Sequence, residues 1–332
     1  MFTNIKLNTK ISSKMSEIFG VCAVAAVVAV PTLYLVQRWA QGGQFKKDDV
    51  RIDGKVVVIT GANTGIGRET ALDLAKRGGR VYLACRDLTK ADTARMEIIH
   101  QSGNKSVFTK HLDLTSFESI RKFVDEFKKC ESKLHILINN AGVMAIPNRQ
   151  TTKDGLEMQI GTNHFGHFLL TVLLLDTIKA SAPARIINVS SLAHKFGKIH
   201  RDDLQLEKSY SRWGSYGQSK LANILFTRQL AKRLQGTNVT VNALHPGAVA
   251  TELGRHLGIL HYLALPMQSF VKTPKSGAQT SIMLAVDPDL DEVSGKYFVD
   301  CAVAAESKEA QCDDTAEWLW KTSKEITKLK AN

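Results

Sequence analysis

The feature that most constrains the fold of this chain is a regular alternation of short apolar runs and longer helical segments. Six runs rich in β-branched residues are predicted to be buried strands, at 55–61, 80–85, 107–112, 135–142, 185–191 and 239–247. Helical segments are predicted at about 66–78, 89–101 and 116–130. Strands that alternate with helices of about ten or more residues predict a parallel sheet with helices on both faces. The expected architecture is therefore a doubly wound α/β domain.

A glycine-rich turn joins the first predicted strand to the first predicted helix. Its sequence, TGANTGIG, spaces Gly61, Gly65 and Gly67 as G-x-x-x-G-x-G. Glycine permits positive φ and a close approach of the backbone, and a helix N-terminus offers free N–H groups to a pyrophosphate. In this position the turn predicts a dinucleotide site on a Rossmann-type sheet. A glycine-rich turn that binds no ligand is the alternative interpretation.

The end of the second predicted strand bears on which nicotinamide cofactor binds. A carboxylate there accepts the 2′-hydroxyl of NAD, whereas an arginine accommodates the 2′-phosphate of NADP. In this chain the strand ends in Cys85, followed by Arg86 and then Asp87. We expect NADP(H), with Arg86 on the phosphate, and Asp87 leaves an NAD-binding alternative open.

Tyr216 and Lys220 stand four residues apart in SYGQSK, just before the apolar run LANILF. On a helix they would share one face, one turn apart. A lysine cation near a phenol favours the phenolate and lowers the tyrosine pKa from about 10 toward neutrality. Such a phenol can donate or accept a proton at physiological pH. Taken alone, however, this spacing is more often incidental on an exposed helix.

Charge and cysteine content exclude several functional classes. The net charge of the 332 residues is +12, but the basic residues are spread along the chain without a nucleic-acid-binding signature. We therefore expect no nucleic-acid partner, because an anionic membrane surface or an anionic cofactor accounts for the charge equally well. The five cysteines include no CxxC pair and the ten histidines form no HExxH motif. Neither a disulfide framework nor a metal site is expected.

An uncharged segment near the N-terminus, Ile18–Val36, is long enough to cross a membrane. At about 1.5 Å per residue it would span roughly 28 Å, close to the thickness of a bilayer's hydrocarbon core. Tyr34 and Trp39 stand where interfacial aromatic residues are common. We predict a transmembrane anchor over 18–39, preceded by a basic segment over 1–17, and a cleaved signal peptide is the alternative.

The rest of the chain is predicted to be a single catalytic domain over 54–332, joined to the anchor by a polar linker over 40–53. A slight excess of basic residues after the anchor favours a cytosolic catalytic domain. An apolar stretch over 257–271 follows the last predicted strand, where open α/β sheets bind ligands.

In their order along the chain, these motifs resemble the classical short-chain dehydrogenase/reductase family. The matching elements are Thr60–Gly67, Asn139–Gly142, Asn163 in GTNHFGHF, Ser191, Tyr216-x-x-x-Lys220, Pro246–Gly247 and Thr251, which together cover about 190 of 332 residues. Within that family, RDDLQLEKSYSRWGSYGQSKLANILFTRQLAKRLQG and FVKTPKSGAQTS resemble the membrane-anchored retinol dehydrogenases of vertebrates. The resemblance runs from about residue 50 to 320 and does not include the first seventeen residues.

The resemblance implies the roles of four residues. Tyr216 is the proton donor or acceptor for the substrate oxygen, and Lys220 lowers its pKa and holds the nicotinamide ribose. Ser191 hydrogen-bonds the substrate oxygen and is preferred to Ser190 because it lies 25 residues before Tyr216, as in the retinol dehydrogenases. Asn163 holds a water molecule that links Lys220 to solvent, with a helix-bending or capping asparagine as the alternative.

The cofactor contacts implied by the resemblance come from several motifs. They are Gly61, Asn63, Thr64, Gly65, Ile66, Gly67, Arg86, Asp113, Leu114, Asn140, Ala141, Gly142, Tyr216, Lys220, Pro246, Gly247 and Thr251. Asp113 is expected beside the adenine and Asn140 beneath the ribose. His164, His167 and His245 are expected to be packing or loop residues.

The implied activity is NADP(H)-dependent interconversion of retinol and retinal by hydride transfer, with Ser191 and Tyr216 on the substrate. The implied location is the endoplasmic reticulum membrane, with the mitochondrial inner membrane as the alternative, and homodimer formation is left open. A reductase of other lipophilic carbonyls, such as lipid aldehydes or steroids, is the alternative activity. A catalytically silent, cofactor-binding membrane scaffold is the alternative from another functional class.

Overall fold

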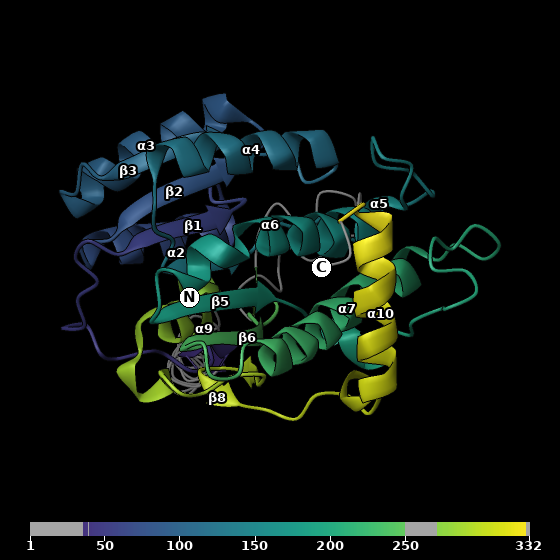
Figure 1. The fold of residues 1–332 in the computed structure, drawn as a ribbon. Coiled ribbons are helices and arrows are strands. Elements are labelled where there is room, and N and C mark those ends of the chain that lie inside the picture. The colour runs from purple at the N-terminus through teal and green to yellow at the C-terminus, as the bar shows by residue number, and fades with distance from the viewer. Residues whose placement is uncertain (1–35, 39, 250–270, 330–332) are drawn as a thin grey trace, which may run out of the picture.

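The computed structural model describes residues 36–38, 40–249 and 271–329. Within them, eight strands form one sheet in the order β3-β2-β1-β4-β5-β6-β7-β8 (Figure 1). The strands are β1 (Val56–Thr60), β2 (Arg80–Cys85), β3 (Val107–His111), β4 (Ile136–Asn139), β5 (Ala184–Val189), β6 (Val239–His245), β7 (Tyr297–Val299) and β8 (Ala302–Val303). The first seven are parallel and β8 pairs antiparallel with β7. The predicted Rossmann-type α/β fold is confirmed.

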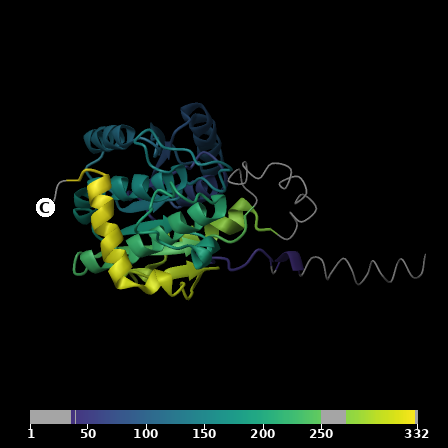
Figure 2. The same ribbon diagram turned by 90° about the vertical axis from the view of Figure 1, so that its right-hand side faces the viewer.

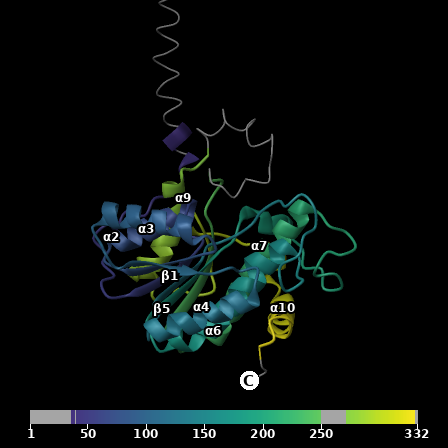
Figure 3. The same cartoon turned by 90° about the horizontal axis from the view of Figure 1, so that it is seen from above.

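Helices cover both faces of this sheet, as the view in Figure 3 shows. One face carries α2 (Gly65–Lys76), α3 (Leu88–Ser102) and α9 (Pro274–Val286), and the other carries α4 (Phe117–Cys130), α6 (His167–Lys179) and α7 (Arg212–Arg233). The remaining elements are α5 (Met158–Ile160), the π-helix η1 (Gly161–Gly166), α10 (Asp313–Ile326), which packs on α7, and the short helices η2 (Leu192–Phe196), η5 (Pro288–Leu290) and η6 (Glu309–Gln311).

The sequence of β1 shows why the sheet is buried on both sides. Val57 and Ile59 pack into the apolar core beneath α2, α3 and α9, whereas Val56 and Val58 pack into the core beneath α4 and α6. Successive side chains of a strand point to opposite faces, so a strand with apolar residues at every position suits a sheet covered on both faces. The same reasoning predicted these strands from their continuous apolar runs.

The order of the strands creates a crevice at the carboxyl ends of the central strands β1 and β4. The chain passes from β1 to β2 and β3 on one side, and then returns to place β4 against the other side of β1. Connections that leave neighbouring strands in opposite directions open a ligand-binding crevice at the carboxyl ends of those strands. Figure 2 views the molecule from the side of these carboxyl ends.

Residues 41–50, which we call the strap, lie in the segment predicted to be a linker and pack against the α/β domain. The Gln41 side chain donates from Nε2 to the carbonyl of Val271 at 3.3 Å and accepts from the N–H of Thr273 at 2.9 Å. Two main-chain carbonyls of the strap, those of Lys47 and Val50, accept from a guanidinium nitrogen of α2's C-cap residue at 2.8 and 3.0 Å. The domain therefore begins within the segment predicted to be a linker.

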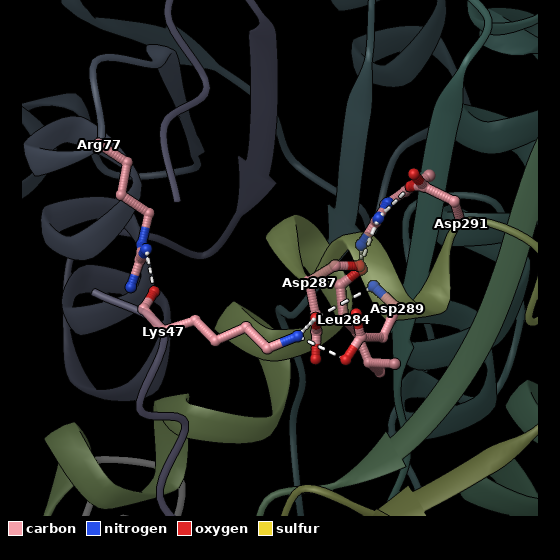
Figure 4. Close-up of polar contacts among 7 residues, drawn as sticks. Lys47, Arg77, Leu284, Asp287, Asp289 and Asp291 are labelled. Atoms are coloured by element: carbon pink, nitrogen blue, oxygen red, sulfur yellow. Dashed lines mark hydrogen bonds and ion pairs between the residues drawn. The ribbon is translucent and has the colours of Figure 1, made fainter. Parts of the chain in front are cut away.

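An ion-pair cluster fastens the strap to the end of α9 (Figure 4). Lys47 Nζ lies 2.7 Å from an Asp287 carboxylate oxygen and 2.5 Å from one of Asp289. Arg77, the C-cap of α2, supplies the guanidinium that binds the strap carbonyls, and it also lies over the ring of Phe45 at 5.5 Å. Two helices on the same face of the sheet thus hold the strap.

The predicted anchor over 18–39 lies outside the described residues, apart from Val36–Arg38. The apolar stretch over 257–271 also lies outside them, apart from Val271. Among the residues that the structure does describe, no helix combines the length and the apolar character that crossing a membrane requires.

Candidate active site

A cavity of about 290 Å³ occupies the crevice at the carboxyl ends of β1, β2 and β4. Twelve of the predicted cofactor residues line it: Gly61, Asn63, Thr64, Gly65, Ile66, Gly67, Arg86, Asp113, Leu114, Asn140, Ala141 and Gly142. Of the other predicted residues, Pro246 and Gly247 lie directly after β6 and Thr251 is outside the described residues. The separate sequence motifs therefore converge on one crevice.

The glycine-rich turn and the start of α2 form a cradle for an anionic group. A Cβ added at Gly67 would lie 2.5 Å from Asn140 Nδ2 and 2.6 Å from the carbonyl oxygen of Gly61, so no larger side chain fits there. Thr64 precedes α2 without a side-chain capping bond, and the first turn of α2 has no acidic residue. The helix N-terminus therefore offers N–H groups and the positive end of its dipole to a pyrophosphate.

Two cations stand at the β2 end of the cavity. Arg86 and Lys90 both line it and are exposed, and neither forms an ion pair within the described part of the chain. Asp87 also lines the cavity, but its carboxylate caps α3 by accepting the N–H of Lys90 at 3.0 Å. This end of the cavity therefore carries two cations without ion-pair partners among the described residues and one carboxylate that is engaged as a helix cap. Lys90, in the first turn of α3, was not predicted.

Asp113 forms the opposite wall of the same end. It accepts hydrogen bonds from the Thr115 N–H at 3.0 Å and hydroxyl at 2.7 Å, and its second oxygen lies 3.1 Å from Lys153 Nζ. Burial alone would raise the pKa of Asp113, but the bonds from Thr115 and then Lys153 hold the pKa below its usual value. Asp113 is therefore a fixed anionic acceptor beside the cavity.

A chain of hydrogen bonds connects the end of β1 and the turn after β4 to the π-helix η1. The hydroxyl oxygen of Thr60 accepts the N–H groups of Asn140 and Ala141, each at 2.9 Å, and lies 2.9 Å from His167 Nε2. His167 Nδ1 lies 2.9 Å from the carbonyl of Asn163. Because a carbonyl only accepts, Nδ1 carries the hydrogen and Nε2 accepts from Thr60. Burial lowers the pKa of His167 to about 4, so the ring is neutral.

The side chain of Asn163 clamps the segment after β4. Its Oδ1 accepts from the N–H of Val143 at 2.9 Å, and its Nδ2 donates to the Val143 carbonyl and to the Ser219 hydroxyl, both at 2.9 Å. Asn163 is fully buried in η1, and both of its amide hydrogens are used. The Asn163 side chain thus fixes the segment after β4 to η1 and α7.

Ser191, Tyr216 and Lys220 lie close together beside the cavity wall. Tyr216 and Lys220 lie one turn apart on α7, with Lys220 Nζ 5.7 Å from the centre of the Tyr216 ring, and the Ser191 hydroxyl is near enough to the Tyr216 phenol to influence its pKa. A Cβ added at Gly142 would lie 3.6 Å from Lys220 Nζ, so this group adjoins the cavity wall. Ser190 points elsewhere and donates to the Lys220 carbonyl at 2.7 Å. The arrangement supports the choice of Ser191 over Ser190.

The pKa values of Tyr216 and Lys220 differ from the expectation that the cation lowers the phenol. Burial raises the pKa of Tyr216 to about 12, against the opposing effect of the Ser191 hydrogen bond. Burial also lowers the pKa of Lys220 to about 8, and its Nζ donates to the Val189 carbonyl at 3.0 Å. Desolvation therefore outweighs the attraction between cation and phenolate. In the protein alone Tyr216 is a neutral phenol that can donate a proton.

Eight residues of the cavity wall were not predicted, and Asp87 was named only as the basis of the NAD-binding alternative. The eight are Ala84, Cys85, Lys90, Leu112, Thr115, Val143, Met158 and Thr162. Most lie beside a predicted motif, whereas Met158, in α5, stands outside all of them. Burial raises the pKa of the Cys85 thiol to about 11, and the described residues hold no group of side chains arranged for a metal ion.

Comparison with known proteins agrees with this geometry. The family model described as short chain dehydrogenase matches residues 55–258. Retinol dehydrogenase 12 of Homo sapiens is 53% identical over 291 residues, which are 88% of this chain and 92% of that protein. Retinol dehydrogenase 11 of Homo sapiens is 51% identical over 84% of this chain and 88% of its own length.

Solved structures share the fold. An uncharacterized protein from Mycobacterium paratuberculosis superposes with a TM-score of 0.69 at 34% identity, over 86% of this chain and 98% of that one. The Pseudomonas aeruginosa RhlG/NADP complex gives a TM-score of 0.60 at 25% identity, over 75% and 95% of the two chains.

Proposed function

Because the chain belongs to the short-chain dehydrogenase/reductase family, we propose that it is an NADP(H)-dependent oxidoreductase that interconverts retinol and retinal. The observation that carries the proposal is that Ser191, Tyr216 and Lys220 lie together, with Lys220 Nζ next to Gly142 of the cavity wall. The names of the relatives, all retinol dehydrogenases at about half identity, support retinoids as the substrate class.

The residues around the cavity suit an NADP molecule. The N-terminus of α2 would hold the pyrophosphate, and Arg86 and Lys90 would hold the 2′-phosphate. Lys220 would reach the nicotinamide ribose, since its Nζ adjoins Gly142 in the wall. When bound, the cofactor supplies or accepts the hydride.

Side chains of the protein then transfer the proton to or from the substrate oxygen and stabilise its charge. The Tyr216 phenol donates its proton to the carbonyl oxygen during reduction and accepts it during oxidation. The Ser191 hydroxyl hydrogen-bonds the same oxygen and stabilises the charge that develops on it. Lys220, with its pKa lowered to about 8, keeps a proton next to Tyr216 near neutral pH. Asn163 and His167 act indirectly, by fixing the segment after β4 and the π-helix.

We also propose that the chain acts at a membrane. The supporting observation is the uncharged run over 18–36, which fits an anchor over 18–39 after a basic segment over 1–17. The catalytic domain is proposed at 54–332, and the strap, which belongs to the proposed linker over 40–53, packs against it. The proposed location is the endoplasmic reticulum membrane with the catalytic domain in the cytosol, with the mitochondrial inner membrane as the alternative.

One assay tests the activity. Membranes that contain the full chain are supplied with NADPH or NADH and with retinal, medium-chain aldehydes or steroid ketones. We expect NADPH-dependent reduction of retinal to have the highest kcat/KM. Faster reduction of the other carbonyls would assign the alternative substrate class, and cofactor binding without any turnover would assign a silent scaffold.

A further inference from the structure

An ion pair between a buried lysine and a partly exposed aspartate lies outside the cavity, beneath the turn that follows β6. Lys272 is only 5% exposed, and its ammonium pairs with the carboxylate of Asp300. The main-chain N–H of Lys272 donates to the carbonyl of Ala248 at 2.9 Å, which places Lys272 alongside this turn. Breaking such a pair leaves an uncompensated buried charge, so the two side chains hold each other in one geometry.

The Lys272 side chain packs directly against the backbone of Gly247. A Cβ added at Gly247 would lie 2.7 Å from Cδ, 2.8 Å from Cε and 3.2 Å from Nζ of Lys272. Gly247 has a φ of +92°, a conformation that other residues rarely adopt. A glycine with that freedom has many alternative conformations, and the lysine stem beneath it restricts them. The Lys272 side chain therefore supports the Pro246–Gly247 turn by packing against it.

Asp300 is itself held in an unusual conformation. Asp300 and Cys301 connect β7 to β8 with φ values of 52° and 60°, the left-handed pattern of a two-residue hairpin turn. Such residues persist where their surroundings fix them. Here the Cys301 N–H donates to the Thr280 hydroxyl at 3.2 Å, and the Asp300 carboxylate pairs with Lys272.

The strap closes over this ion pair. A Cβ added at Gly42, whose φ is +67°, would lie 2.5 Å from the Asp300 carboxylate and 2.6 Å from Lys272 Nζ. A Cβ added at Gly43 would overlap the carbonyl of Asp300, and the Cys301 thiol lies 3.6 Å from the Gly43 carbonyl. The two strap glycines thus pack directly against the pair, while the Asp300 side chain stays partly exposed.

We propose that Lys272 is a positioning residue that holds the Pro246–Gly247 turn in the conformation that receives the nicotinamide half of the cofactor, and that strap residues Gly42 and Gly43 lock Lys272 in place. The inference rests on the proposed cofactor site. The strap would then influence cofactor binding indirectly, through Lys272, although no strap residue lines the cavity.

The test compares two ligands of the full-length protein. NADPH occupies the whole proposed site, whereas adenosine 2′,5′-bisphosphate lacks the nicotinamide half. Lys272→Met keeps the stem and removes the charge, and Asp300→Asn removes the partner. We expect both variants to weaken NADPH binding about tenfold, measured by titration calorimetry, and to leave the bisphosphate within about twofold of wild type.

Two matched controls separate positioning from general stability. Lys47→Met breaks the other ion-pair cluster of the strap, at the end of α9 (Figure 4), and should lower the melting temperature without changing affinity for NADPH. Gly42→Ala should act like Lys272→Met. Gly54→Ala introduces the same left-handed strain, because Gly54 has a φ of +73°, but an added Cβ there would meet no atom within 4 Å. Gly54→Ala should therefore leave the affinity for NADPH unchanged.

The outcomes are distinct. Equal weakening of both ligands by Lys272→Met, or no weakening of NADPH, would overturn the positioning role. A wild-type protein that binds neither ligand would instead overturn the proposed cofactor site. If Lys272→Met fails to fold, the comparison of Gly42→Ala with Gly54→Ala decides the question, because equal NADPH affinities in those two variants would contradict the lock.

Discussion

Ser190 and Lys220 are joined by a hydrogen bond of 2.7 Å from the serine hydroxyl to the lysine main-chain carbonyl. This bond ties the end of β5 to α7, while the next residue, Ser191, lies near the phenol of Tyr216. Under the proposed function the two adjacent serines have separable roles, one in the fold and one at the substrate oxygen.

Exchanging each serine for alanine should divide these functions. Ser191→Ala should lower kcat by about 10²- to 10³-fold, because a hydrogen bond to the developing charge is lost, with little change in thermal unfolding. Ser190→Ala should cost about 1 kcal/mol of stability and leave kcat nearly unchanged. Steady-state kinetics and thermal denaturation of both variants provide the measurement. The reverse pattern would move the catalytic role to Ser190.

Tyr216→Phe should reduce turnover to less than about a hundredth of wild type, because only the transferable proton is lost while the ring stays. Binding of NADPH, measured by fluorescence, should change little. Tyr82→Phe is a suitable control, since the Tyr82 hydroxyl donates to Glu131 at the end of α4 and Tyr82 does not line the cavity. Turnover retained in Tyr216→Phe would contradict its assignment as the proton donor.

Lys220 should make stability depend on alkaline pH. Its pKa is about 8 in the folded protein and ordinarily 10.5. Between these values the unfolded state binds more protons, so the free energy of unfolding rises with pH. Relative to Lys220→Met, wild type should gain on the order of 2 kcal/mol between pH 7 and pH 10. Urea unfolding of both proteins at the two pH values measures this gain, and a constant difference would show that Lys220 is not desolvated.

The protein should prefer NADPH to NADH at least about tenfold, because a charge-assisted contact to the 2′-phosphate contributes on the order of 1.5–3 kcal/mol. Arg86→Ala and Lys90→Ala should each raise the KM for NADPH and leave that for NADH unchanged. Arg86→Asp should invert the preference. Equal use of both cofactors by wild type would mean that Asp87 binds the ribose despite its role as the cap of α3.

Deleting residues 1–40 should release the protein from membranes and leave the cofactor site folded, because the strap begins at Gln41. Alkaline carbonate extraction of the full and truncated chains, with NADPH binding as the measure of folding, makes the comparison. A folded truncated chain that stays in the pellet would place a second anchor in the catalytic domain. A full chain that washes off would remove the anchor from the proposal.

The periodicity of the sequence predicted the parallel sheet because each central strand is apolar on both faces. The short strands β7 and β8 escaped prediction, since three and two residues cannot establish a period. The cofactor turn was predictable because only glycine fits at Gly67, which leaves a mark in the sequence. Thr162 left no such mark, because its place in the cavity depends on the π-helix.

The site also shows where residue identity does not determine electrostatics. The spacing of Tyr216 and Lys220 correctly placed them one turn apart on a helix. It could not reveal that both are buried, and burial is the larger influence on both pKa values. Likewise, the composition of the strap indicated a polar linker, because the partners of Gln41 and Lys47 lie more than two hundred residues away in the sequence.

The docked strap would restrict how the domain is oriented toward a membrane that contains its substrate. A free chain of ten residues would let its ends wander over roughly 15–20 Å and let the domain turn in any direction. With residues 41–50 fixed to α2 and α9, a domain anchored through 18–39 has no such slack. It would present one constant side to the bilayer. Encounter with a lipophilic substrate would then be governed by lateral diffusion in the membrane and not by a rotational search of the enzyme.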